Sequence, residues 1–410
     1  MMGKATYLSN KNVLSIGAFL RREFVILFLF CFGLSHFFFD AYCLYAMAPL
    51  IFILPIKAKI DNDAIFWLLF GILYLMVSYL HPYMATKRNL DWLFFYPMIC
   101  YMMGKYLATK YCTNGYIICF SYLLLFICFS GRELFSIIDS MRNGGLISDD
   151  RIITDEKGNN SYTATLYGLY LCVLIAGLGL LFERVNNHLE TLIKYVAVGF
   201  GVISLLAMLY LLTRGSLVVA FAVISFSLLQ YISALHGARR IVIISTLSFF
   251  IFILFVILSQ TFYFDIIYQS FSERNEFDGR DLGGRMGRWQ DALELIPISP
   301  LGTETGMLVS ENYLSTWAHN MWLDCFLHAG WINGVILFVL SFSHFINVVK
   351  IQNLKIIPQI LRHYMFSISI TILIACSFEP TIDSVYGLFL IFVFHCGSTR
   401  ALQINSSKFL

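Results

Sequence analysis

The stretch IVIISTLSFFIFILFVIL, residues 241–258, carries no charged side chain and shows no alternation of polar and apolar positions. Its length is close to the roughly 20 residues with which an α-helix crosses the hydrocarbon core of a bilayer. Strands of outer-membrane barrels instead alternate apolar and polar residues in segments of roughly ten. We therefore interpret this stretch as a membrane-spanning helix, and residues 25–39 have the same character.

The composition of the 410-residue chain is typical of a membrane protein. Hydrophobic residues make up 59% of it and charged residues 13%, whereas a soluble domain carries roughly 25% charged residues. The net charge is +3 and no basic cluster is interleaved with aromatic residues, so the sequence does not indicate nucleic-acid binding. The ten cysteines lie in or beside apolar stretches without a C-x-x-C pair, which predicts that they pack as small apolar side chains.

Apolar stretches recur along the whole chain and predict a single transmembrane domain over residues 1–410. They number about twelve, and most are long enough to cross the bilayer as a helix. The fold class is therefore all-α and polytopic, and the first stretch, which lacks a small-residue cleavage pattern, is expected to remain attached. The expected spans are residues 24–39, 41–56, 64–80, 92–108, 115–131, 162–182, 195–212, 216–235, 241–259, 327–349, 364–379 and 384–397.

The basic residues divide unevenly between the two sides that these spans define. The side that holds both termini receives more of them, and lysine predominates in its short connections, which predicts that both termini are cytoplasmic. The basic residues of the outer side are mostly arginines. Because a guanidinium group offers a planar set of donors that matches phosphate or carboxylate, we expect an outward-facing anion site. The alternative is that these arginines only pair with acidic residues of the outer loops.

Two long polar loops lie on the outer side, at residues 132–161 and 260–318. The first has the composition of turns and exposed charges. Within the second, RMGRWQDALELI has helical spacing and the following PISP ends the helix. We interpret it as an amphipathic helix that lies on the membrane surface or caps a cavity, although a surface helix without a role would have the same pattern. One face is expected to carry Met286, Trp289, Ala292, Leu293 and Ile296, and the opposite face Arg285, Arg288 and Asp291.

Three places on the outer side combine charge or acid–base chemistry with an unusual setting. Arg214 in LLTRGSLVV interrupts a long apolar stretch, where a charge is costly unless it pairs, faces water or binds an anion. Alternatively, this arginine is a turn residue that reaches to the lipid headgroups. Arg285 and Arg288 lie in the amphipathic segment, and His319, followed by Asn320, stands at the outer mouth of a span.

In this order, the segments around these residues resemble the O-antigen ligase and O-antigen polymerase family of bacterial cell-envelope glycosyltransferases. That family shows an Arg-Gly or Arg-Ala pair between two helices, then a large periplasmic loop with Arg and Trp four apart. A stretch ending in Pro-Leu-Gly follows, and His-Asn opens the next helix before a Gly-rich segment. The matching pieces here are TRGS at Arg214, RMGRW at 285–289, SPLGTETG at 299–306 and HNMWLDCFLHAGWING at 319–334. The resemblance covers residues 210–335, and the rest of the chain agrees only in hydropathy and number of spans.

The resemblance implies a GT-C-like fold in the bacterial inner membrane, with the active site on the periplasmic face. It also implies transfer of a glycan from undecaprenyl pyrophosphate to a sugar hydroxyl. The implied partners are the lipid-linked oligosaccharide and the bilayer, together with a flippase and a chain-length regulator.

Such a transfer needs charge stabilisation at the leaving pyrophosphate and a base for the acceptor hydroxyl. Arg214 and Arg285 are expected to stabilise the pyrophosphate, and His319 to act as the base. The expected substrate-binding residues are Arg288, Asn320 and Trp289. The large loop at 260–318 contains no D-x-D pair, so we predict metal-independent chemistry without a cofactor. The remaining histidines are expected to be packed or interfacial.

The sequence does not decide which acceptor molecule receives the glycan. We favour a polymerase, which joins one lipid-linked repeat unit to another, because the fourth span DWLFFYPMICYMMGKYLATK and the HNMWLD opening are similar to those of polymerases. A ligase would instead move the finished glycan to the lipid A core. A transporter or flippase could have as many spans, but it should show inverted halves with broken helices and charges near the midplane. A purely structural membrane protein is the remaining alternative.

Overall fold

The computed structural model describes the chain in twelve segments, with gaps between them. The described residues are 2–35, 40–80, 94–142, 152–154, 160–185, 187–211, 214–233, 285–303, 308–310, 313–315, 317–379 and 381–407. The expected span at 241–259 and the loop residues 260–284 lie outside these ranges, and so do the side chains of Arg214 and Arg285. Each of the other expected spans overlaps a helix of the structure.

Six helices among the described residues are long and apolar enough to cross a bilayer, which confirms the prediction of an α-helical membrane protein. They are α6 (Gly115–Arg142), α8 (His188–Tyr210), α9 (Arg214–Ser233), α13 (Met321–Gln352), α14 (Gln359–Phe378) and α16 (Tyr386–Ser407). Their outward faces carry exposed apolar side chains such as Phe221 and Ile332, the surface that lipid would cover. The total of about twelve spans stays a prediction.

The other helices of the bundle are α1 (Met2–Gly33), the 3-10 helix η1 (Asp40–Met47), α2 (Leu50–Lys57), α3 (Asn62–Leu80), α5 (Tyr96–Tyr111), α7 (Ala164–Ile175), the 3-10 helix η2 (Ala176–Leu180) and α15 (Thr381–Ser384). The expected span at 41–56 is divided between η1 and α2. Pro49, which precedes α2, has no amide hydrogen for a continuous helix. α2 is only eight residues long, so this stretch is not one long helix.

The two long polar loops contain regular structure beyond the helix that was expected in the second. α6 continues to Arg142, so the first loop begins later than the expected residue 132, because Leu134 and Ile137 remain buried at helical spacing. β1 (Ile152–Thr154) and β2 (Asn160–Thr163) then form an antiparallel hairpin. The second loop contains α12 (Arg285–Leu295), the 3-10 turn η3 (Ile296–Ile298), and an antiparallel hairpin of β3 (Leu308–Ser310) and β4 (Tyr313–Ser315). The expected helix at 285–296 and its end at PISP are thus confirmed.

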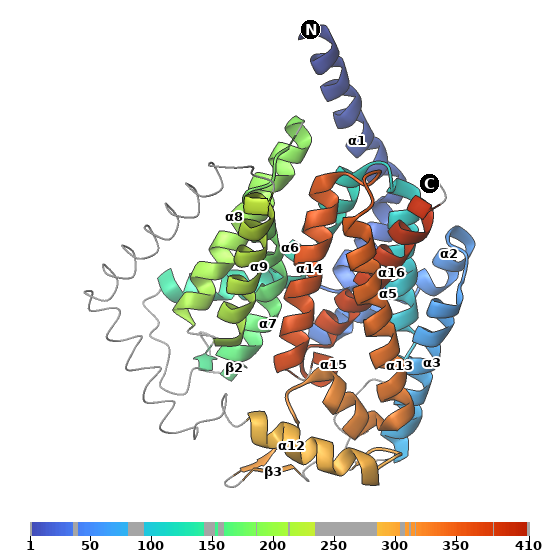
Figure 1. Ribbon diagram of the computed structural model, residues 1–410, viewed down its shortest axis with the longest axis vertical. Coiled ribbons are helices and arrows are strands. Elements are labelled where there is room, and N and C mark those ends of the chain that lie inside the picture. The colour runs from blue at the N-terminus through green and yellow to red at the C-terminus, as the bar shows by residue number, and fades with distance from the viewer. Residues whose placement is uncertain are drawn as a thin grey trace, which may run out of the picture.

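The core is tightest where α5 and α16 lie side by side (Figure 1). A Cβ atom at Gly104 would lie 2.0 Å from the Phe394 carbonyl oxygen, and one at Gly397 would lie 2.0 Å from that of Tyr101. Glycine at both positions therefore lets the two backbones approach more closely than any other residue would allow. The fully buried Trp67 of α3 packs its ring edge-on against two phenylalanine rings of α16.

Two histidines and three hydroxyl side chains form a buried hydrogen-bonded group in this core. The Nδ1 and Nε2 atoms of His395 each lie 2.7 Å from a hydroxyl oxygen, those of Tyr122 and Ser369 respectively. His344 Nδ1 lies 3.0 Å from the Thr399 hydroxyl. These partners satisfy polar atoms that would otherwise be costly to bury, so both histidines are packed, as predicted. Eight of the ten cysteines are also buried, which confirms their packing as small apolar side chains.

The bundle has two chemically different ends (Figure 1). At the first, which we call the α12 end, α12 lies across the start of α13 and the end of α14. At the second, the lysine end, Lys57, Lys105 and Arg400 lie around one cavity near α1. α16 starts directly after α15 at the α12 end and carries Arg400 near its other terminus.

Candidate functional site

His319 forms the turn before α13 in a backbone conformation that is unusual for a residue with a side chain. Its φ of 57° lies in the left-handed region. The amides on either side donate to a single carboxylate: Ala318 N lies 2.6 Å from Asp324 Oδ1, and Asn320 N lies 2.9 Å from Asp324 Oδ2. Asp324 is only 3% exposed. Its charge-assisted hydrogen bonds therefore hold the turn that presents the histidine.

Asn320 begins α13 as its N-cap. Its side-chain oxygen accepts hydrogen bonds from the amides of Trp322 at 3.1 Å and Leu323 at 3.2 Å, which would otherwise lack intrahelical partners. Its side-chain nitrogen donates to the Ser377 carbonyl at 3.2 Å, near the end of α14. Where the sequence predicted a substrate contact, the structure thus shows a side chain that fixes the start of α13 against α14.

Glu379 brings a carboxylate to the predicted base. It lies directly after α14, and its Oε2 is 3.2 Å from His319 Nδ1. The His319 side chain is 26% exposed and that of Glu379 10% exposed, so the pair lies at the protein surface without being freely solvated. His319 Nε2 has no hydrogen-bond partner among the described residues. A carboxylate on Nδ1 favours the tautomer with its proton on that atom, which leaves Nε2 as the acceptor.

Trp289 connects α12 to the same turn. Its indole nitrogen donates to the Ala318 carbonyl at 2.9 Å, and its ring lies 6.4 Å from that of Phe378. The fully buried Ala292 packs beside it. This contact orients α12 with Trp289 and Ala292 toward the protein.

The predicted apolar face of α12 is only partly docked against the protein. Met286 and Leu293, expected with Trp289 on one face, are 49% and 61% exposed. Arg288 and Asp291, expected on the opposite face, are half-buried instead. The reason is that the helix docks against the turn before α13 through Trp289 and Ala292, which rotates the other apolar residues outward.

α13 is broken at Gly330, and the Pro-Leu-Gly segment fills the break. Gly330 has φ 78° and ψ 174°, a conformation that is essentially restricted to glycine. In an unbroken helix the amide of Trp331 would donate to the carbonyl of Leu327. Here Trp331 N donates to the Pro300 carbonyl at 3.0 Å, and the Leu327 carbonyl accepts from Thr303 N at 2.7 Å. The segment SPLGT is therefore joined directly to the break in α13, although the two lie apart in the sequence.

The three predicted arginines belong to elements that start at or near the α12 end. Arg285 begins α12, and Arg288 lies one turn further on and is half-buried. Arg214 begins α9. α9 and α14 run in opposite directions (Figure 1), and the ring centroids of Phe226 and Phe366 are 4.1 Å apart. The start of α9 and the end of α14 are equally distant in sequence from this contact, so the Arg214 backbone lies at the level of Glu379.

Asp291 is the remaining acidic residue near the site on α12. Burial and the neighbouring Glu294 raise the pKa of its carboxyl above the ordinary value. Its Oδ2 atom is buried and has no hydrogen-bond partner among the described residues. Among all residues that the structure describes, no three His, Cys, Asp or Glu side chains are grouped so that they could hold a metal ion. Metal-independent chemistry stays a prediction.

The structure therefore brings His319, Asn320 and Trp289 together and adds two carboxylates that sequence reasoning missed. Asp324 stands inside the HNMWLD segment, where its spacing from Asn320 was the available signal. Glu379 stands at the end of the expected span 364–379, and the available signal was that a carboxylate at the end of an apolar run needs a partner. In comparisons with known proteins, no family model matches the chain and no curated protein matches its sequence significantly.

Proposed function

We propose that this chain is a membrane glycosyltransferase of the O-antigen ligase and polymerase kind, and within it an O-antigen polymerase. It transfers a glycan from undecaprenyl pyrophosphate to a sugar hydroxyl at the periplasmic face of the bacterial inner membrane. The proposal includes about twelve spans, a GT-C-like arrangement and cytoplasmic termini. The observation that carries it is the His319–Glu379 pair at 3.2 Å, seated at the α12 end with one ring nitrogen open.

The pair is suited to removing a proton from an alcohol. In the proposed step the acceptor oxygen bonds to the anomeric carbon of the donor, the bond from that carbon to the pyrophosphate oxygen breaks, and His319 Nε2 takes the hydroxyl proton. The imidazolium that forms is stabilised by the adjacent Glu379 carboxylate. A positioned base of this kind contributes roughly 10²–10⁴-fold to rate.

We assign stabilisation of the leaving pyrophosphate to Arg214 and Arg285. Arg288 is the alternative to Arg285 for this role. Their elements, α9 and α12, start at the same end of the bundle as the histidine turn. A guanidinium can form two parallel hydrogen bonds to phosphate oxygens and keeps its charge at every working pH. Trp289 holds α12 beside His319 through the Ala318 carbonyl, so Arg285 and Arg288 would be positioned together with the base.

The test is transfer by the purified full-length protein, with a lipid-linked repeat unit as both donor and acceptor. Substitutions His319→Ala and Glu379→Gln are each expected to lower the rate at least 100-fold, with the protein still folded. The matched control is His363→Ala, because His363 also pairs with a buried carboxylate, that of Glu183, near the other end of α14. Equal activity of His319→Ala and wild type would contradict the proposed base. Addition of a chelator is expected to leave the rate unchanged.

The glycolipid profile of cells separates the alternative acceptors. Deletion of a polymerase leaves lipid A core capped by a single repeat unit, and complementation with wild type, but not with Arg214→Ala or Arg285→Ala, restores the ladder. Uncapped core with polymer accumulating on the lipid carrier would identify a ligase instead. An unchanged ladder in every strain would reject both and favour another surface glycan or a transporter.

A further inference from the structure

A charged cavity of about 930 Å³ opens at the lysine end, far along the bundle from His319. Its walls come from α1, the connection between α2 and α3, α5 and α16. Its two acidic lining residues are Asp61 and Asp63. Its six basic lining residues are Arg22, Lys57, Lys59, Lys105, Lys110 and Arg400.

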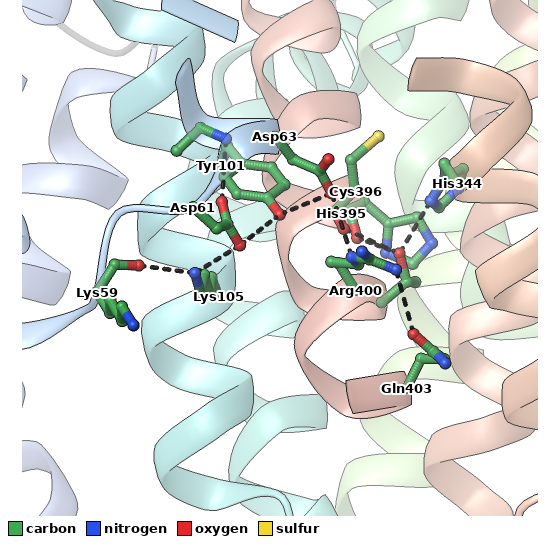
Figure 2. Close-up of polar contacts among 12 residues, drawn as sticks. Lys59, Asp61, Asp63, Tyr101, Lys105, His344, His395, Cys396, Arg400 and Gln403 are labelled. Atoms are coloured by element: carbon green, nitrogen blue, oxygen red, sulfur yellow. Dashed lines mark hydrogen bonds and ion pairs between the residues drawn. The ribbon is translucent and has the colours of Figure 1, made fainter. Parts of the chain in front are cut away.

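The two acidic side chains are occupied by partners within the wall (Figure 2). Lys105 Nζ lies 2.5 Å from Asp61 Oδ2, and Arg400 Nε lies 3.2 Å from Asp63 Oδ2. The Tyr101 hydroxyl lies 3.3 Å from one oxygen of each carboxylate and can donate to either. Each acid of the cavity is therefore neutralised by a cation beside it.

A third carboxylate, Glu23, lies behind the wall and is fully buried. It pairs with Lys110 and accepts from the Tyr106 hydroxyl at 2.8 Å and the Tyr111 hydroxyl at 3.0 Å. Arg22 approaches the same carboxylate only at 4.0 Å and is 73% exposed. The internal ion pairs thus account for Lys105, Lys110 and Arg400, and leave the other cations in excess.

Lys57 and Lys59 make up most of this excess. Both side chains are exposed, and neither has an ion pair with a carboxylate among the described residues. Lys57 Nζ lies 5.6 Å from the centroid of the Tyr106 ring, which places its charge at the wall of the cavity. An open cavity with unbalanced ammonium groups attracts an anion, and a lysine ammonium group can contact a phosphate as a point charge.

The surface beside the cavity is apolar. Phe52 and Ile56 on α2 are 77% and 87% exposed, and Ile60 in the connection to α3 is 44% exposed. In a helical membrane protein such side chains face acyl chains, while lysines at the helix ends reach the headgroup layer. A ligand that matches both surfaces carries a phosphate at one end and hydrocarbon at the other.

We propose that this cavity binds the phosphate headgroup of an anionic phospholipid, with its acyl chains along α2. Lys57, Lys59 and Arg22 contact the phosphate, and the Lys105–Asp61 and Arg400–Asp63 pairs form the floor that keeps the headgroup at the rim. The site is separate from the proposed transfer reaction and does not depend on it. Basic pockets between helices at one membrane face are an established way to hold such headgroups.

The test measures lipid retention by the purified full-length protein with native mass spectrometry, after addition of phosphatidylglycerol or phosphatidylcholine in neutral detergent. Wild type is expected to retain phosphatidylglycerol preferentially. The double substitution Lys57→Gln and Lys59→Gln is expected to weaken that retention roughly 10- to 30-fold, since two surface cations are lost. The matched control is Lys350→Gln with Lys355→Gln, which removes one lysine from the last turn of α13 and one from the connection to α14, both outside the cavity lining.

Three results would overturn the proposal. Equal retention of both lipids by wild type would show that the headgroup charge is not recognised. An equal loss in the control would show that the whole lysine end attracts anions without a site. A third arm adds inorganic pyrophosphate without lipid: thermal stabilisation that the double substitution abolishes would identify a soluble phosphate compound as the occupant. Both substituted pairs are exposed, and size-exclusion profiles confirm that the variants remain folded before retention is compared.

Discussion

At the scale of single residues, the candidate site depends on a buried carboxylate that does not touch the reacting atoms. Asp324 accepts from the amides on both sides of His319 and so fixes the left-handed turn. A carboxylate can accept at both oxygens, whereas an amide side chain can accept at only one. Glu379 then orients the ring from the end of another helix. The geometry of the base is therefore set by two acids from different elements.

Replacement of Asp324 by asparagine is expected to lower both stability and transfer. One of the two backbone amides would lose its acceptor while remaining buried, which costs about 1–3 kcal/mol. The measurement is the Tm of the purified protein together with its transfer rate, which should fall at least tenfold. Glu294→Gln serves as the control, because Glu294 is an exposed residue of α12. A wild-type rate in Asp324→Asn would show that the turn does not need the clamp.

The ionised carboxylate of Asp291 is expected to destabilise the folded protein, by an amount that depends on pH. Because burial and Glu294 raise the pKa of its carboxyl, the folded state binds the proton more tightly than the unfolded state. Its contribution is then most favourable below the ordinary value of 3.8 and is lost as pH rises through the raised value. Asp291→Asn should therefore raise the Tm at pH 7, and this gain should shrink toward pH 4. A gain that is constant with pH would contradict the assignment.

At the scale of elements, two glycines with positive φ join the second polar loop to α13. Gly302 has φ 88° and its hypothetical Cβ would lie 2.8 Å from the His328 carbonyl oxygen. That of Gly330 would lie 2.8 Å from the Pro300 carbonyl oxygen. The exchanged hydrogen bonds replace the one that the helix gives up at its break. The loop is thus part of the α13 structure.

Gly330→Ala is expected to destabilise the protein by about 1–3 kcal/mol, because the backbone conformation at this position is essentially restricted to glycine. Thermal unfolding in detergent measures the effect. The matched control is Gly199→Ala in α8, where an added Cβ meets nothing within 4 Å and the substitution should stabilise by about 0.5–1 kcal/mol. If Gly330→Ala were as stable as Gly199→Ala, α13 would not be broken as described.

At the scale of the whole molecule, the two ends of the bundle differ in chemistry. The α12 end carries the histidine, its carboxylate and the first residues of the arginine-bearing elements, whereas the other end carries the lysine-rich cavity. Lysine excess is typical of the cytoplasmic side. The arrangement thus supports the proposed orientation, with the transfer site outward and the phospholipid site inward.

Cysteine labelling tests this orientation. Met286→Cys places an exposed thiol on α12, at the α12 end of the bundle. Lys355→Cys places one in the connection after α13, at the opposite end. With a membrane-impermeant maleimide and an intact inner membrane, only Met286→Cys is expected to react, and Lys355→Cys should react after the membrane is opened. Wild type measures the background from its native thiols, most of which are buried. Labelling of Lys355→Cys alone in intact cells would reverse the orientation.

The sequence by itself determined the class of protein and much of its local structure. Apolar runs specified membrane helices, since hydropathy and length act within one segment. The same local rules predicted the helix at 285–296, and the family resemblance placed His-Asn at the opening of a helix, where Asn320 is the N-cap of α13. Local periodicity did not determine which side of α12 would face the protein, because that depends on what the helix docks against.

Only the tertiary structure decided the partners of the candidate site. Glu379 lies 60 residues from His319 in the chain, and the exchange of hydrogen bonds between SPLGT and HAGW joins segments from different elements. The lysine-end cavity likewise assembles charges from four parts of the chain. Hydrogen bonds and ion pairs act over a few ångströms in space, so the sequence could supply these groups but could not show which of them would meet.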